Sequence, residues 1–175
     1  MSIIARVRAA WGKFRELLPL LTARVLSLKT RGKIYSTYIR PVLLYASECW
    51  SPTVENMNKL QRNDCAMIRW ICNVKLKHRI SSASLLEKLC ITEIKSAVRY
   101  NRLRWFGHVQ RNEGCIRHVA NMVVEGSRSR GRPKKNWANT VLHDKEDWNM
   151  TRVDPMDRLL WRKMLKTKHI GVQPP

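Results

Sequence analysis

The chain has 175 residues, with 34 Lys and Arg against 13 Asp and Glu, giving a formal charge of +21 at pH 7. Apolar residues make up 44% of it, enough to bury a core, which argues against an intrinsically disordered chain. So much positive charge repels itself unless a polyanion neutralises it. We therefore expect DNA or RNA as the partner, with a ribosome-like scaffold or an anionic membrane surface as the alternatives.

The first 75 residues predict a small bundle of three helices. Apolar residues recur at helical steps from Ile3 to Val25, which predicts an amphipathic arm that Pro19 kinks or divides. An arm with this many arginines also fits a mitochondrial transit peptide, but its scant serine favours the structural interpretation. A break is expected at Arg31-Gly32, before a second helix that Pro41 bends.

The second helix carries a broad apolar stripe that calls for burial on more than one side. The stripe comprises Ile34, Tyr35, Tyr38, Ile39, Val42, Tyr45 and Ala46. A turn at Ser51-Pro52-Thr53 follows, with Thr53 as the N-cap of a third helix that runs through Ile71.

Residues 76–115 predict a pair of helices. Ser84 and Glu87 fit a capping box for a short leucine-rich helix, and Thr92 can cap the longer helix that follows. The pair has helix-turn-helix proportions, but the turn Cys90-Ile91-Thr92 lacks the glycine common in such motifs, which favours a packing role. The longer helix has an apolar stripe of Ile94, Val98, Trp105 and Val109, and a basic side of Lys95, Arg99, Arg102 and Arg104.

Residues 116–170 predict a basic C-terminal region with two short helices. Ile116 to Val124 fits either a helix or a strand, and Glu125 to Lys135 is expected to be a flexible linker. One helix carries Trp137, Val141 and Trp148. The last begins at Asp154-Pro155, with Asp154 as its cap. Its expected inward side chains are Met156, Leu160 and Met164. The fold class is therefore mainly α.

The linker holds the densest positive charge, because five of the eight positions from 128 to 135 are basic. The candidate nucleic-acid-binding residues there are Arg128, Arg130, Gly131, Arg132, Pro133, Lys134 and Lys135. Their Arg-Gly-Arg-Pro core matches the hook with which some chromatin proteins enter a narrow A·T minor groove. A linker that binds phosphates without sequence preference fits equally well. Arg99, Arg102 and Arg104 form a second candidate surface.

The sequence shows no constellation typical of catalysis. It has no Asp-Asp pair, no Walker-type loop and no Gly-x-Ser-x-Gly elbow. Its densest acidic group, Asp144, Glu146 and Asp147, predicts a solvated helix face rather than a metal site. We therefore expect no enzymatic activity, no cofactor, no metal and no small-molecule substrate.

The five cysteines lack zinc-ligand spacing and predict reduced, buried small hydrophobes in a nuclear or cytoplasmic protein. No apolar run is long enough to predict a membrane span. Trp105, Trp137 and Trp161 lie in or beside helical stripes, which favours core anchors over platforms for stacking bases.

Several blocks, in order, resemble the C-terminal part of LINE-type (non-LTR) retrotransposon reverse transcriptases. The blocks are Lys33–Trp50, Met67–Cys72 (MIRWIC), Leu103–Val109 (LRWFGHV) with Arg111, Arg128–Trp137, Val141 with Asp144, Asp157-Arg158, and Trp161-Arg162. The resemblance spans most of the chain. It implies a thumb-like helical bundle that grips a template–primer duplex, followed by a region that helps to seat RNA or target DNA.

In that family the fingers, palm and metal-binding carboxylates precede the thumb, whereas this sequence starts at Met1 where they would already have ended. The resemblance therefore implies a non-catalytic fragment that binds RNA, DNA or an RNA–DNA hybrid, with the missing polymerase portion as a further candidate partner. Two alternatives stay open: an architectural DNA-binding protein with an AT hook, and a basic module that docks an acidic protein.

Overall fold

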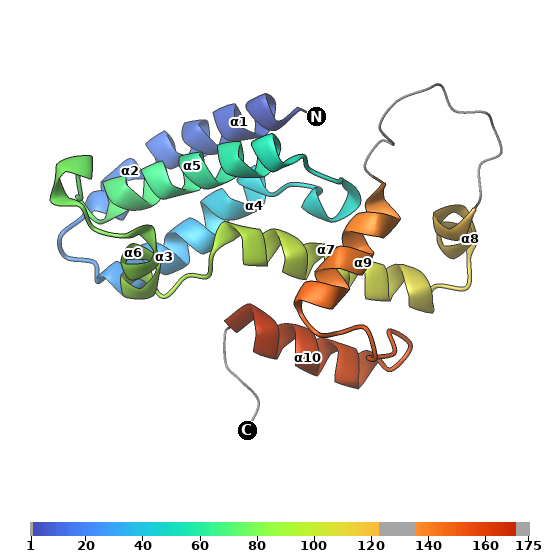
Figure 1. Cartoon of the computed structure of the whole chain (residues 1–175). Coiled ribbons are helices and arrows are strands. Elements are labelled where there is room, and N and C mark those ends of the chain that lie inside the picture. Colours follow the sequence, from blue (N-terminus) through green and yellow to red (C-terminus); the bar gives the residue numbers. More distant parts are fainter. Residues whose placement is uncertain (1, 123–135, 171–175) are drawn as a thin grey trace. The chain divides into compact units, whose positions relative to one another are not determined.

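The computed structural model describes residues 2–122 and 136–170. Every regular element within those residues is helical, which confirms the mainly α class (Figure 1). The chain divides into two compact units, one of Met1–Ala46 with Pro52–Ala97, the other of Ser47–Ser51 with Val98–Pro175. These bounds differ from the predicted segments 1–75, 76–115 and 116–170, because the helix expected to complete the middle segment contributes mostly to the second unit.

The first unit starts with the predicted arm, divided where proline was expected to divide it. Helix α1 spans Ile3–Glu16 and α2 spans Leu18–Thr22, with Pro19 in the first turn of α2. The hydroxyl of Ser2 caps α1 by accepting a hydrogen bond from the Ala5 amide at 3.3 Å. The apolar stripe ends earlier than predicted, since Val25 is almost fully exposed.

The expected break at Arg31-Gly32 is wrong, because α3 (Leu28–Ile34) runs straight through Gly32. A Cβ atom at this position would lie 2.1 Å from the carbonyl oxygen of Leu89. The glycine therefore serves close packing between α3 and the helix that ends at Leu89, instead of ending its own helix.

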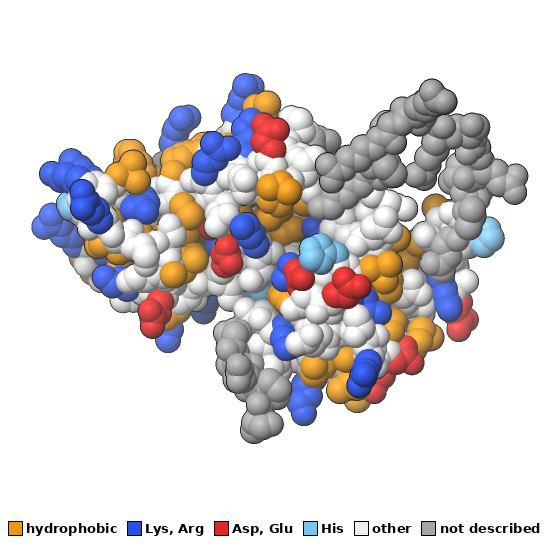
Figure 2. Space-filling view, in the orientation of Figure 1, with side chains coloured by type: hydrophobic (Ala, Val, Ile, Leu, Met, Phe, Trp, Pro, Cys, Tyr) orange, Lys and Arg blue, Asp and Glu red, His pale blue; other side chains and the backbone are white. Residues whose placement is uncertain are grey.

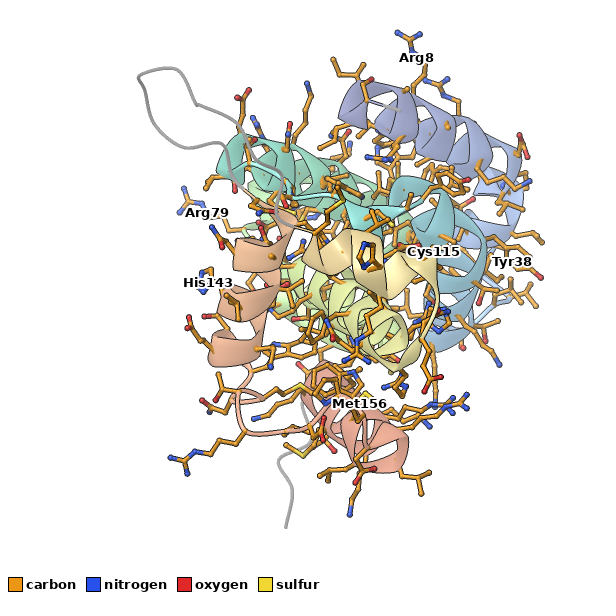
Figure 3. The ribbon with its side chains drawn as sticks, turned by 90° about the vertical axis from the view of Figure 1, so that its right-hand side faces the viewer. Arg8, Tyr38, Arg79, Cys115, His143 and Met156 are labelled. Carbon is orange, nitrogen blue, oxygen red and sulfur yellow. The ribbon has the colours of Figure 1, made fainter. Side chains whose placement is uncertain are left out.

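The change of helix geometry falls just before Pro41. Residues Tyr35–Ile39 form a π-helical turn, and the amide of Arg40 donates to the carbonyl of Tyr35. Helix α4 (Arg40–Leu43) follows, with Pro41 at its start. Proline has no backbone N–H, so Pro41 cannot donate a helical hydrogen bond to a carbonyl of the preceding turn. Tyr35 and Ile39 are buried, but Tyr38 (labelled in Figure 3) and Tyr45 are exposed, so burial of the whole stripe was a wrong expectation.

Helices α5 and α6 also belong to the first unit. Helix α5 (Val54–Ile71) begins at Thr53, whose hydroxyl accepts from the Asn56 amide at 3.2 Å, as predicted. Helix α6 (Ser82–Leu89) is capped by Ser81, which accepts from the Ser84 amide. The predicted capping box of Ser84 and Glu87 is therefore wrong, since the helix starts before Ser84.

The core of the first unit lies where α1 packs on α4 and α5, and where α3 packs on α6. Its largest buried apolar side chains are Phe14, Leu21, Tyr35, Ile39, Leu43, Leu60, Met67, Ile68, Ile71, Leu85 and Leu89. Within this core Arg40 and Asp64 form an ion pair, with Nη2 and Oδ2 3.0 Å apart, and the Tyr35 hydroxyl donates to Asp64 Oδ1 at 2.7 Å.

The second unit is built on α7 (Ile94–Arg111), whose first turn still belongs to the first unit. Helix α8 (Cys115–Asn121) makes the ambiguous stretch helical as far as Asn121, whereas Val123 and Val124 lie outside the described residues. Helix α9 (Trp137–Asp147) matches a predicted helix. The core cluster consists of Leu103, Val141, Trp148, Met150, Trp161 and Leu165.

The last helix, α10 (Arg158–Ile170), starts later than predicted. The Asp157 carboxylate accepts from the amides of Leu159 and Leu160, whereas Asp154 accepts only from Met156 in the preceding turn. This shift changes the inward face. Trp161 and Leu165 are buried, Met164 is partly buried, and Met156 and Leu160 are exposed.

The three tryptophans predicted as anchors differ in burial. Trp161 is buried and donates from Nε1 to the carbonyl of Leu103 at 3.1 Å. Trp137 is half-buried and donates to the carbonyl of Glu48 at 2.7 Å. Trp105 is half-buried and lies beside the His108 ring. Among the described helices, none is both long and apolar enough to cross a membrane.

Candidate nucleic-acid interface

The seven predicted linker residues, Arg128, Arg130, Gly131, Arg132, Pro133, Lys134 and Lys135, lie outside the residues that the structure describes. The second predicted surface, on α7, is described in full. Its three arginines do not share one environment, because two of them are ion-paired to α9 and the third is exposed.

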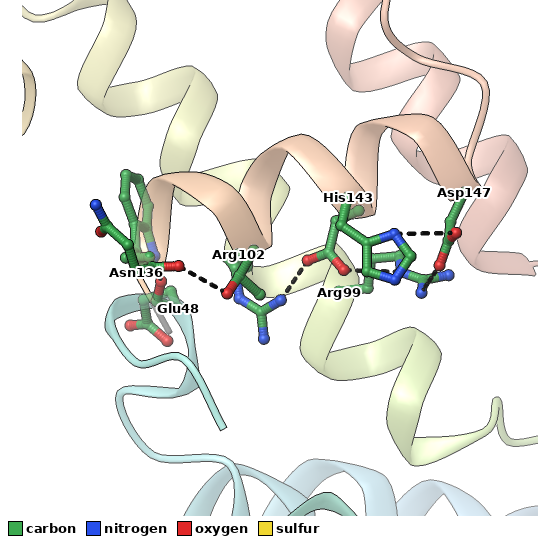
Figure 4. A network of polar contacts seen from close by, with 9 residues as sticks. Glu48, Arg99, Arg102, Asn136, His143 and Asp147 are labelled. Carbon is green, nitrogen blue, oxygen red and sulfur yellow. Dashed lines mark hydrogen bonds and ion pairs between the residues drawn. The ribbon is translucent and has the colours of Figure 1, made fainter. Parts of the chain in front are cut away.

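Arg99 and Arg102 converge on the Asp144 carboxylate of α9 (Figure 4). Arg99 Nε donates to Asp144 Oδ1 at 3.1 Å and its Nη2 pairs with Asp147. Arg102 pairs with Asp144 Oδ2 and is only 3% exposed. Burial lowers the pKa of Arg102, and Asp144 opposes that shift. Arg102 therefore links α7 to α9 through a buried ion pair. Its assignment to an exposed basic surface was wrong.

The same contacts correct the prediction for the acidic group of α9. Asp144 is only 5% exposed and is surrounded by guanidinium groups, so it does not belong to a solvated face. A buried carboxylate keeps its charge only when it is paired and hydrogen-bonded. Arg104, in contrast, is exposed, and its guanidinium lies over the Tyr100 ring at 5.8 Å from the centroid.

A seam between α7 and α10 brings together arginines that are far apart in sequence. The Tyr100 ring stacks on His169 at 4.5 Å between centroids, while near the other end of α7 the Arg111 guanidinium donates to the carbonyl of Pro155. The two helices therefore run antiparallel. Gly107 permits their close approach, because a Cβ there would lie 2.5 Å from Trp161 Nε1 and 3.0 Å from Arg111 Nη1.

Arg111 of α7 and two arginines of α10, Arg158 and Arg162, carry positive charge at this seam, and we call these three residues the arginine cluster. Arg158 and Arg162 are exposed and lie one turn apart on α10. Burial lowers the pKa of Arg111, and the positive charges of Arg158 and Arg162 lower it further. Within residues 2–122 and 136–170 none of the three forms an ion pair.

Such a cluster suits a phosphate, because a guanidinium group can bind two phosphate oxygens through parallel hydrogen bonds. The acid next in sequence, Asp157, has its Oδ1 engaged by the amides of Leu159 and Leu160. Sequence analysis did not assign the cluster a binding role. The four-residue spacing of Arg158 and Arg162 was the available signal, but their meeting with Arg111 depends on the packing of α10 on α7.

The cysteines do not behave as predicted. Cys49, Cys90 and Cys115 are exposed, and Cys65 and Cys72 are half-buried, so their description as buried hydrophobes was wrong. Cys90 occupies the left-handed turn (φ 53°) that ends α6, a surface position that glycine usually takes. In the described part of the chain, no group of three or more His, Cys, Asp or Glu side chains could hold a metal ion.

Comparison with known proteins adds no relative. No protein-family model, curated protein or solved structure matches this chain.

Proposed function

We propose that this chain is a non-catalytic nucleic-acid-binding region, of the kind that follows the polymerase domain in LINE-type reverse transcriptases. It holds RNA, DNA or an RNA–DNA hybrid through contacts between arginine or lysine side chains and phosphates. The observation that carries the proposal is the arginine cluster at the α7–α10 seam, whose positive charges act on one another and which forms no ion pair among the described residues.

Three further features support the proposal. The formal charge of +21 repels itself in a compact state, and a polyanion would neutralise it. The basic stretch from Arg128 to Lys135 offers phosphate contacts of its own. The blocks that resemble the retrotransposon family include Arg111, Arg158 and Arg162, so the cluster unites three separate parts of that likeness.

Binding is expected to work mainly by neutralising charge. Each arginine that contacts a phosphate releases a condensed counterion, so affinity falls as salt rises. The cluster adds geometry to this effect, because Arg111 is held in place by its hydrogen bond to the carbonyl of Pro155 while Arg158 and Arg162 extend from a rigid helix. We expect no primer extension by the chain alone.

Binding to labelled RNA, DNA duplex and hybrid of equal length, measured by fluorescence anisotropy, tests the proposal. Between about 50 and 200 mM salt the affinity should fall steeply, with a log–log slope of about 0.9 for each phosphate neutralised on DNA duplex. Replacing Arg111, Arg158 and Arg162 together by Gln should reduce that slope by about 2 to 3.

The matched control removes the same charge from Arg8, Arg15 and Arg24, which are exposed on and after α1 and α2. This control should change the slope much less. An equal effect of both triple variants would show that only net charge matters and would reject the cluster as a site. If the wild-type chain binds no polynucleotide at low salt, an acidic protein partner becomes the better account.

An architectural role is the second candidate, and the Arg130-Gly131-Arg132-Pro133 sequence favours it. In that case the wild-type chain should prefer A·T-rich over G·C-rich duplex, and the double change Arg130→Ala and Arg132→Ala should abolish the preference. Weaker binding by the double variant to both duplexes equally would leave the linker as a phosphate contact without sequence preference.

A further inference from the structure

A long groove follows α5 in the first unit. It has a volume of about 1300 Å³ and is lined by one face of α5 and by the loop after it, including Asn58, Arg62, Arg69, Trp70, Lys75 and Leu76. Pockets for single small molecules usually measure roughly 300 to 1,000 Å³. The groove is therefore better suited to a segment of chain than to a small molecule.

Trp70 presents an aromatic surface in this groove. It is 58% exposed, although it lies between Ile68 and Ile71, which α5 buries in the core. An indole this exposed gains little from folding, so its place in the core packing does not explain it. Leu76 lines the same groove and is exposed as well, so the groove presents a second apolar side chain besides the indole.

The charges of the groove are positive. Arg62, Arg69 and Lys75 line it, and the described lining residues include no acid. Arg69 donates from Nη2 to the carbonyl of Ile80 at 3.3 Å, whereas its buried Nη1 has no hydrogen-bond partner in the described residues. The exposed Lys77 and Arg79 extend the basic surface along the loop, where Figure 2 shows Lys and Arg side chains gathered at the left of the view.

We infer that this groove binds an unstacked, single-stranded stretch of nucleic acid, with a base on the Trp70 indole and phosphates on Arg62, Arg69 and Lys75. Bases stack on aromatic side chains whatever their sequence, and a basic groove follows the backbone. The amides of Asn58 and Asn73 lie along the groove and can bond to base edges. The inference rests on the proposed function for the class of ligand but places it in a different unit of the chain from the arginine cluster.

An acidic peptide would also meet the positive charges, but it would leave the exposed indole without a flat partner. A base satisfies both features at once, because its π face covers the indole while the attached phosphate meets a guanidinium group. Charge complementarity together with the aromatic surface therefore favours nucleic acid over protein as the occupant.

The test compares Trp70→Ala with Trp70→Phe on a labelled oligothymidylate and on a duplex of equal length. Trp70→Ala loses the stacking of one base, so its affinity for the oligothymidylate should be about ten-fold weaker than that of the wild-type chain. Trp70→Phe keeps an aromatic ring and should keep most of the affinity. Duplex affinity should change less than two-fold. Tyr38→Ala is the matched control, since Tyr38 is a similarly exposed aromatic residue of the first unit outside the groove.

A second measurement follows the phosphates. Arg69→Gln should reduce the salt slope for the single strand by about 0.7, the value for one phosphate contact on single-stranded nucleic acid. Binding of oligothymidylate should also quench tryptophan emission more in the wild-type chain than in Trp70→Phe. Circular dichroism of each variant checks that the helices are intact.

The outcomes separate this inference from the proposed function. If the wild-type chain binds the oligonucleotide and Trp70→Ala binds as tightly, the groove site is overturned while the proposed function stands. If Trp70→Ala loses single-strand binding and the arginine-cluster variant does not, the groove stands and the cluster fails. If polyglutamate binds in a Trp70-dependent way that oligothymidylate cannot displace, a protein occupant replaces nucleic acid. If no polynucleotide binds at all, both proposals fall.

Discussion

Each unit of this chain buries one aspartate against arginine, but the two arrangements differ. In the first unit Asp64 meets a single guanidinium, that of Arg40, through two hydrogen bonds of 3.1 and 3.0 Å, and Tyr35 donates a third. In the second unit Asp144 is shared between Arg102, which is buried, and Arg99, which is partly exposed and also reaches Asp147. The first is a closed pair within the core, and the second is a network that opens to solvent.

The difference shows how a chain with a large surplus of cations can fold. Two of its carboxylates, Asp64 and Asp144, lie where an arginine is buried, and the buried arginine paired there is withdrawn from the surface. Arg40 and Arg102 belong to this structural class. Arg158 and Arg162, which are exposed and have no ion pair among the described residues, belong to a second class that the fold does not pair. The net charge of the chain does not show which arginines are paired in the fold and which are not.

Removal of Asp64 should have the largest effect on stability. Asp64→Ala leaves Arg40 buried without a counterion, which should cost about 3 to 5 kcal/mol. Hydrogen exchange of amides in α4 and α5 measures the loss. Glu16→Ala, which breaks an exposed pair with Lys13, is the control and should change stability by less than about 1 kcal/mol. Similar losses from both changes would refute the closed-pair description.

Removal of Asp144 should reduce the stability of the fold less than removal of Asp64, because one of its two arginines keeps another carboxylate partner. Asp144→Ala leaves Arg102 buried and unpaired, but Arg99 retains Asp147, so we expect about 3 kcal/mol, near the lower limit for a broken buried pair. The loss should appear as faster hydrogen exchange in α7 and α9. A cost clearly above that of Asp64→Ala would reverse the ranking of the two arrangements.

A glycine substitution tests the packing of the first unit. Gly32→Ala would bring a Cβ within 2.1 Å of the Leu89 carbonyl oxygen, so we expect a loss of about 1 to 3 kcal/mol from overpacking of α3 against α6. Gly12→Ala is the matched control, since nothing lies within 4 Å of its added Cβ and it occupies the interior of α1. That change should stabilise by about 0.5 to 1 kcal/mol. Urea denaturation followed by circular dichroism compares the two, and equal effects would exclude the close approach at Gly32.

The sequence could predict those features that depend on neighbouring residues, but not those that depend on distant contacts. Periodicity and local signals found α1, α2, α5 and α9, because the division at Pro19 and the cap at Thr53 depend only on neighbouring residues. Gly32 was mistaken for a break, because its role depends on a carbonyl more than fifty residues away. Asp144 was assigned to solvent for the same reason, since two arginines of another helix bury it. The arginine cluster and the Trp70 groove likewise require knowledge of which faces the core occupies.

The hydroxyl of Tyr35 tests the difference between the Asp64 pair and the Asp144 network. Tyr35 donates to Asp64, whereas no hydroxyl donates to Asp144 among the described contacts. Tyr35→Phe removes one donor from Asp64 but leaves Arg40 in place, so the expected cost near neutral pH is about 1 kcal/mol. Burial, and then the charge of Asp64, raise the pKa of Tyr35 well above its ordinary value.

Because folding raises the pKa of Tyr35, the stabilisation by its hydrogen bond to Asp64 is complete below the pKa of tyrosine in the unfolded chain, about 10. That stabilisation is lost as the pH rises from there through the pKa of Tyr35 in the folded chain. The stability gap between the wild-type chain and Tyr35→Phe should therefore narrow above about pH 10. Urea denaturation of both chains from pH 8 upward, in steps of about half a unit, measures the gap. A gap that stays constant across this range would mean that Tyr35 ionises alike in both states. Burial in the core would then not disfavour the ionised form of Tyr35, contrary to the closed-pair description.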